Sequence, residues 1–166
     1  MSTTQKVIHW WNQFPTELRT ISRVRLLASI GAGGVIYLTP LAFNKIDLSA
    51  TQIGSGLAAA ALTGTISRLL AGNALDKGTH SSLVIRWAAL LAILADFWLG
   101  NAQSFLDFVA GELILGAAAG FYWPAVELSV PSSCADYPSS KGFALVRSAD
   151  ALGTSLGALI GSLMAL

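Results

Sequence analysis

Five long apolar segments separated by short polar stretches dominate the sequence and restrict what it can fold into. They cover approximately residues 26–43, 53–72, 83–100, 105–130 and 142–166. About 20 helical residues cross the ~30 Å hydrocarbon core of a bilayer. Lipid offers exposed backbone groups no hydrogen-bond partner, and the segments lack the alternation of a membrane β-barrel. The sequence therefore predicts an all-α integral membrane protein with a five-span transmembrane helix bundle over residues 26–166.

The amino-acid composition points the same way. Hydrophobic residues make up 54% of the 166-residue chain and charged residues only 11%, whereas a soluble domain carries about 25% charged residues. Such a chain has too little polar surface to cover a core in water, so we expect a lipid bilayer to surround it. The net charge of +1 gives no indication of nucleic-acid binding.

Residues 1–25 precede the first apolar segment and form a predicted cytoplasmic or interfacial segment. The apolar run that follows has no small-residue cleavage site of the kind that ends a signal peptide. Trp10 and Trp11 lie in this segment, and indole rings suit the headgroup layer of a membrane. The alternative is a tail that docks on a partner protein.

The basic residues predict an orientation. Lys45 falls on one side of the predicted bundle, and the other nine basic residues fall on the opposite side, which the positive-inside rule makes cytoplasmic. We expect a multi-pass protein of the inner membrane with a cytoplasmic N-terminus and the C-terminus on the opposite side. Because an apolar segment ends the sequence at Leu166 without a polar tail, we also expect a truncated or split protein. The nine residues are Lys6, Arg19, Arg23, Arg25, Arg68, Lys77, Arg86, Lys141 and Arg147.

The connection between the second and third segments contains a recognisable motif. Gly72 is followed by Asp76, Lys77 and Gly78. A glycine at position 72 would let another helix approach closely, with Asp76 on the same helix face. The arrangement resembles the signature between spans two and three of the major facilitator superfamily (MFS) of secondary transporters, although Gly78 comes one position early. The resemblance implies a cytoplasmic gate in which Asp76 engages the eleventh span of the other half.

Three further segments resemble spans of the same family. Residues 48–72 resemble its second span, near whose start they carry the Thr-Gln-Ile-Gly entry, and residues 111–131 resemble its fourth. Residues 141–161 resemble the glycine-rich fifth span. The resemblance covers residues 26–166 and implies the N-terminal part, about five spans, of a twelve-span transporter built from two halves. Glycines spaced four apart predict close helix packing at Gly116, Gly120, Gly153, Gly157 and Gly161.

Two departures from the family pattern concern coupling. Glu112 occupies the position at which the fourth span of the family often carries a basic residue linked to proton coupling. In the fifth segment, Ala158 and Ser162 stand where the family signature has a proline and a glycine. Because of these two departures, we do not expect the chain to couple antiport in the way that is usual for the family.

Ionisable residues inside the predicted spans are the main functional candidates, because a charge at bilayer depth usually faces a cavity or a partner. Asp96 and Glu112 lie in the outer halves of their spans, where solvation at the interface is an equal alternative. Asp150 lies three residues after Arg147, which allows a same-face ion pair. The cavity of the family is lined partly by spans one, four and five. The candidate cavity or coupling residues are Tyr37, Asp96, Glu112, Trp123 and Asp150.

Nothing in the sequence indicates catalysis. Cys134 is the single cysteine, and His9 and His80 have no Asp or Cys at ligand spacing, so no metal site is predicted. Nucleotide-binding and nucleophile-elbow motifs are missing from the sequence. We therefore expect neither an enzyme nor a cofactor.

Two functional hypotheses follow. The first is a truncated or split MFS-type transporter, which moves a small solute by alternating access only when a complementary half or a second copy is supplied. The second is a transporter-derived scaffold or accessory subunit that packs against a larger membrane complex without transport activity.

Overall fold

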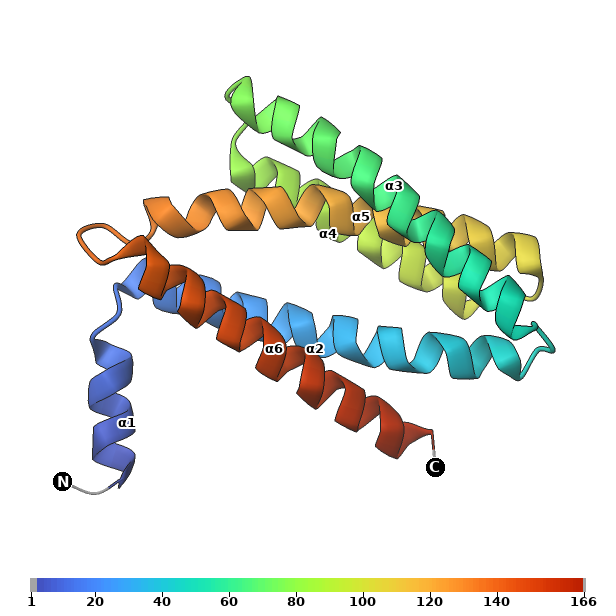
Figure 1. The fold of residues 1–166 in the computed structure, drawn as a ribbon, viewed down its shortest axis with the longest axis horizontal. Helices are drawn as coiled ribbons and strands as arrows, with labels where there is room; N and C mark the ends of the chain where they lie inside the picture. The colour runs from blue at the N-terminus through green and yellow to red at the C-terminus, as the bar shows by residue number, and fades with distance from the viewer. Residues whose placement is uncertain (1–2, 166) are drawn as a thin grey trace. The chain divides into compact units, whose positions relative to one another are not determined.

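The computed structural model describes residues 3–165, and within that range it contains six α-helices and no strands (Figure 1). Five of the helices, α2 to α6, are long and apolar enough to cross a membrane. The prediction of an all-α integral membrane protein with five spans is therefore confirmed. The helices are α1 (Thr3–Asn12), α2 (Thr16–Asn44), α3 (Ala50–Asp76), α4 (Ser81–Gly100), α5 (Phe105–Ser132) and α6 (Ser139–Met164).

Most of these helices extend beyond the apolar segments seen in the sequence. The helix that contains the first segment begins at Thr16, not at residue 26. At the start of α3, the Ser49 and Gln52 side chains each bond the backbone N–H of the other residue, at 3.3 and 2.9 Å. This capping box starts the helix ahead of the apolar run. Hydropathy detects only the part of a helix that suits lipid, and polar caps prolong the helix beyond it.

The chain divides into two compact units. The first unit contains the residues up to Thr39 and those from Ser129 onward, and the second unit contains Pro40–Leu128. Helices α2 and α5 therefore contribute to both units. The division within α2 falls at Pro40, whose ring removes one backbone hydrogen bond from the helix interior.

In the first unit, α2 and α6 run in the same direction with their backbones in direct contact. A Cβ atom added at Gly153 would lie 2.5 Å from the backbone oxygen of Leu26, and one at Gly157 would overlap that of Ile30. Each step of four residues along α6 thus matches a step of four along α2. Near the start of both helices, the unit is closed by a buried cluster of Phe14, Leu18, Val130, Cys134, Leu145 and Val146.

In the second unit, α3 and α5 form another parallel pair of the same kind. A Cβ atom at Gly116 would overlap the backbone oxygen of Ala60, and one at Gly120 would overlap that of Gly64. The hydroxyl of Thr63 donates a hydrogen bond of 3.1 Å to the backbone oxygen of Leu113. Helix α4 packs against this pair through two buried contacts. They are the cluster of Ala71, Val84 and Ala125 and the side chain of Leu99 against Gly111.

The α2–α6 contact predicts different effects for two glycine substitutions. Gly157→Ala places a methyl group on the backbone of α2, and we expect it to lower the free energy of unfolding by about 1–3 kcal/mol. Gly31→Ala is the matched control, because an added Cβ there meets none of the described atoms within 4 Å. The control should leave stability unchanged or raise it by up to about 1 kcal/mol through helix propensity.

Unfolding of the purified chain in mixed detergent micelles, followed by circular dichroism, measures both substitutions. Equal stability of the Gly157→Ala and Gly31→Ala variants would contradict the close approach of α2 and α6.

Candidate functional site

Asp150 lies in a polar cluster between α2 and α6. The Arg25 guanidinium donates a hydrogen bond of 2.6 Å from Nη2 to Oδ1 of Asp150, and the Ser29 hydroxyl donates one of 2.6 Å to the same oxygen. The side chains of Arg25 and Asp150 are 5% and 22% exposed, and Ser29 is buried. The carboxylate therefore has a charged and a neutral donor within one unit.

This arrangement differs from the ion pair considered from the sequence, which placed Arg147 beside Asp150 on one helix. The partner of Asp150 in the structure is Arg25, 125 positions earlier in the chain. Arg25 and Ser29 are four residues apart and therefore share a face of α2. A pattern of a base and a hydroxyl at this spacing was visible in the sequence, but nothing there indicated that this face meets α6.

Glu112 is buried in the second unit. Its exposed fraction is 2%, and its Oε1 atom has no hydrogen-bond partner among residues 3–165. Phe108, Gly116 and Gly120 contact α3, and Glu112 shares their helix face because the four residues are spaced four apart. This burial argues against the alternative that the outer interface solvates Glu112, since a solvated side chain would be exposed.

The other candidate cavity residues have different environments. Asp96 is exposed on α4, Tyr37 is 41% exposed on α2, and Trp123 is half-buried on α5. Tyr37 and Asp150 belong to the first unit, whereas Asp96, Glu112 and Trp123 belong to the second. The structure thus does not gather the five candidates within one unit.

The motif between α3 and α4 forms a helix end with defined geometry. Asp76 is the last residue of α3, Lys77 follows as its C-cap, and Gly78 has a φ of +90°. The backbone N–H of Gly78 bonds the oxygen of Leu75 at 2.9 Å, and that of the next residue, Thr79, reaches back to α3 at 3.0 Å. This is a Schellman motif, in which a glycine adopts the left-handed conformation at low cost.

No helix of the described chain approaches Gly72, since an added Cβ there would meet no atom within 4 Å. Helix α4 contacts α3 through a different face, which includes the buried Ala71. Asp76, Lys77 and Gly78 are all exposed.

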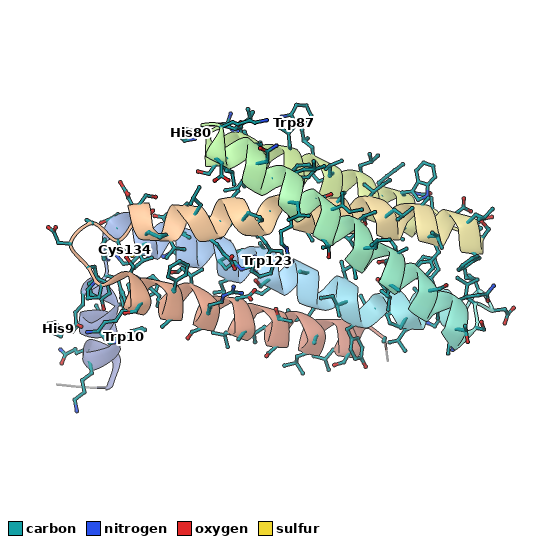
Figure 2. The ribbon with its side chains drawn as sticks, turned by 45° about the horizontal axis from the view of Figure 1, so that its top comes forward. His9, Trp10, His80, Trp87, Trp123 and Cys134 are labelled. Atoms are coloured by element: carbon teal, nitrogen blue, oxygen red, sulfur yellow. The ribbon has the colours of Figure 1, made fainter. Side chains whose placement is uncertain are left out.

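The cysteine and the histidine between α3 and α4 have structural surroundings. Cys134 is buried in the apolar cluster of the first unit, at the turn between α5 and α6 (Figure 2). His80 caps α4, with its Nδ1 atom 2.9 Å from the hydroxyl of Ser82. Over residues 3–165, no three His, Cys, Asp or Glu side chains lie close enough together to hold a metal ion.

Five apolar helices, four of them packed in two glycine-lined pairs, with a buried acid on α5, define a multi-pass integral membrane protein. Over 139 residues the chain is 24% identical to multidrug resistance protein 1 of Bacillus subtilis strain 168, which is an MFS transporter. The match covers 84% of this chain and 36% of the length of the relative. It confirms the resemblance to the superfamily. No family model matches the chain, and no solved structure matches it.

The polar cluster at Asp150 predicts strong coupling between two residues far apart in the chain. Asp150→Asn and Arg25→Gln should each lower the free energy of unfolding by roughly 2–4 kcal/mol, because each removes one member of a largely buried ion pair. The double variant should lose less than the sum of the two by at least about 1 kcal/mol. Unfolding in mixed micelles provides the four stabilities of the cycle.

Glu17→Gln is the control for this cycle, because Glu17 is an exposed acid on the same helix as Arg25. It should change stability by no more than about 0.5 kcal/mol. Additive effects of the two cluster substitutions would show that the ion pair does not hold α2 and α6 together.

Proposed function

We propose that this chain is part of an MFS-type secondary transporter and that it moves a small solute by alternating access together with a complementary set of spans. The similarity to multidrug resistance protein 1 and the five apolar helices support this proposal. The chain spans 36% of the length of that relative. A transporter of this kind places its solute site between two halves, so the complementary half is an essential partner.

The burial of Glu112 carries the proposal. An ionised carboxylate without a partner is costly to bury, so Oε1 of Glu112 requires a proton, a cation or a donor group of the solute. Structural stability does not explain the residue, because an apolar side chain would fill the same space without this cost. We therefore assign Glu112 the role of binding the coupling ion or the solute.

The other candidates receive separate roles in the proposal. The carboxylate of Asp150 is occupied by Arg25 and Ser29, which favours a role in holding α2 against α6 over a role in coupling. Tyr37 and Trp123 remain proposed cavity residues. Asp96 is exposed on its helix and lacks the burial that distinguishes Glu112.

Asp76 is the proposed gate residue. A negative charge in the last turn of a helix is unfavourable, because the helix dipole already places partial negative charge there. Local structure therefore gives no reason for an acid at this position. A partner in the complementary half, engaged when the cytoplasmic side closes, would provide one.

The proposed substrate class rests on the name of the relative. The relative is named for multidrug resistance, so we propose drug-like small solutes for this chain as well. The buried polar group of the proposed site is the carboxyl of Glu112. It favours solutes with a hydrogen-bond donor or a positive charge.

The test fuses this chain to the spans of multidrug resistance protein 1 that follow the matched region, and measures drug transport driven by a pH gradient in proteoliposomes. We expect saturable uptake by the fusion and none by the 166-residue chain alone. Glu112→Gln should lower gradient-driven uptake by about tenfold or more, because an amide cannot take up or release a proton. Glu112→Asp should retain part of the activity.

Asp107→Asn is the matched control, since Asp107 is a half-buried acid in the first turn of the same helix whose carboxylate already accepts a hydrogen bond from the Ser104 hydroxyl. Unchanged coupling in Glu112→Gln would remove Glu112 from the mechanism. Saturable transport by the chain alone would refute the need for a complementary half. Co-purification with a larger membrane complex, together with an inactive fusion, would favour the scaffold function.

The orientation is a separate proposal, with the N-terminus in the cytoplasm. In a Cys134→Ala background, cysteines are placed at Thr79, between α3 and α4, and at Asn101, between α4 and α5. We expect a membrane-impermeant maleimide to label the Asn101→Cys variant in intact cells, and the Thr79→Cys variant only after permeabilisation. The reverse pattern would invert the topology.

A further inference from the structure

Helix α1 has a different direction from the rest of the first unit. It runs across the beginning of α2 and α6, whereas those two helices lie along each other (Figure 1). The corner between α1 and α2 is fixed by Arg19, which donates hydrogen bonds of 2.9 Å to Oδ1 of Asn12 and 3.1 Å to the hydroxyl of Thr16. If α2 and α6 cross the membrane, α1 lies along the membrane surface at their ends.

Aromatic side chains attach α1 to the helices that it crosses. Phe14 is 6% exposed and packs in the buried cluster with Leu18 and Val130. Its ring centroid lies 5.0 Å from that of Trp10, 6.3 Å from that of Trp11 and 5.3 Å from that of Tyr137. Since Tyr137 lies between α5 and α6, the rings join three parts of the unit.

Other side chains of α1 remain uncovered. Ile8 and Trp10 are 55% and 49% exposed, and His9 and Trp10 project from this helix in Figure 2. Exposed aliphatic and indole groups on a helix that lies across the spans suit the boundary between headgroups and acyl chains.

Two cations lie against this group of rings. The Arg23 guanidinium carbon is 5.5 Å from the centroid of Trp11, and Nζ of Lys141 is 6.0 Å from the ring of Tyr137. Both cations remain exposed. We refer to Trp11, Phe14, Arg23, Tyr137 and Lys141 as the aromatic–basic cluster.

The charge balance at this end of the unit is positive. The acids nearby in the sequence are Glu17 and Asp136, both exposed. Lys6, Arg19, Arg23 and Lys141 outnumber them by four to two, without counting the histidine of α1. An anionic surface is therefore attracted to this end of the unit.

We propose that α1 and the aromatic–basic cluster form a binding surface for the headgroups of anionic phospholipids. The guanidinium of Arg23 and the ammonium of Lys141 contact the lipid phosphate, while Trp10 and Ile8 enter the layer of the upper acyl chains. The rings of Trp11 and Tyr137 hold the two cations in place for this contact. A zwitterionic lipid offers the same phosphate without the net negative charge, and so it binds more weakly.

The test reconstitutes the full chain in bilayers and measures quenching of tryptophan fluorescence by brominated lipids. Equal mole fractions of brominated phosphatidylglycerol and brominated phosphatidylcholine are compared in mixed bilayers of otherwise identical composition. The difference between the unchanged chain and its Trp10→Phe, Trp11→Phe double variant isolates the signal of α1 from the three other tryptophans. We expect the phosphatidylglycerol to be enriched about fivefold at these two indoles.

Charge variants decide between a specific surface and general burial in lipid. The Arg23→Gln, Lys141→Gln variant should lose the enrichment, whereas Arg23→Lys, Lys141→Arg should keep it because the charges remain. Lys45→Gln is the matched control, since Lys45 is exposed and belongs to the second unit.

Equal quenching by the two lipids would overturn the proposal. Failure of both lipids to quench would also overturn it, since the surface would then be covered by a protein or a second copy of the chain. Enrichment that persists in the Arg23→Lys, Lys141→Arg variant excludes misfolding as the cause of the loss in the Arg23→Gln, Lys141→Gln variant.

Discussion

The close approach of two parallel helix pairs, α2 with α6 and α3 with α5, is the contact on which the rest of the structure depends. Lipid tails are as apolar as leucine, so helices in a membrane gain little by hiding leucine from lipid. They associate through backbone contact and polar bonds, and backbone contact requires glycine. Gly157 on Ile30 and Gly116 on Ala60 provide it in the two pairs. These backbone contacts determine which buried polar groups meet a hydrogen-bond partner and which do not.

The two acids beside these pairs illustrate two uses of a buried charge. Asp150 receives a guanidinium and a hydroxyl from α2, and the resulting bonds fix the alignment of α2 with α6. Glu112 lies on a similarly packed helix face and has an oxygen with no partner in residues 3–165. The first acid is compensated by the fold and the second is not. This contrast directs the search for function to Glu112, although both residues look alike in the sequence.

The features that were predictable from the sequence are the local ones. Span length and glycine spacing depend on neighbouring residues, so the five helices and the faces of Gly116 and Gly157 could be derived from periodicity. The bond between Arg25 and Asp150 joins positions 125 residues apart and depends on which helices meet. The burial of Glu112 depends on the rotation of α5 about its axis, which no single apolar segment determines. The capping bonds that lengthen α3 beyond its apolar run are formed by polar side chains, so a hydropathy pattern does not predict them.

The end of α3 shows how local physics separates structural from functional residues within one motif. Gly78 departs from the superfamily spacing by one position, and the structure gives that position a local reason, because the Schellman motif needs a residue with positive φ there. Gly72 has open space around it, so no helix contact within residues 3–165 explains it. Asp76 stands against the helix dipole and gains nothing from the fold of residues 3–165 that would offset this. Of the four residues in the motif, Asp76 is therefore the one whose presence argues most strongly for a partner beyond this set of helices.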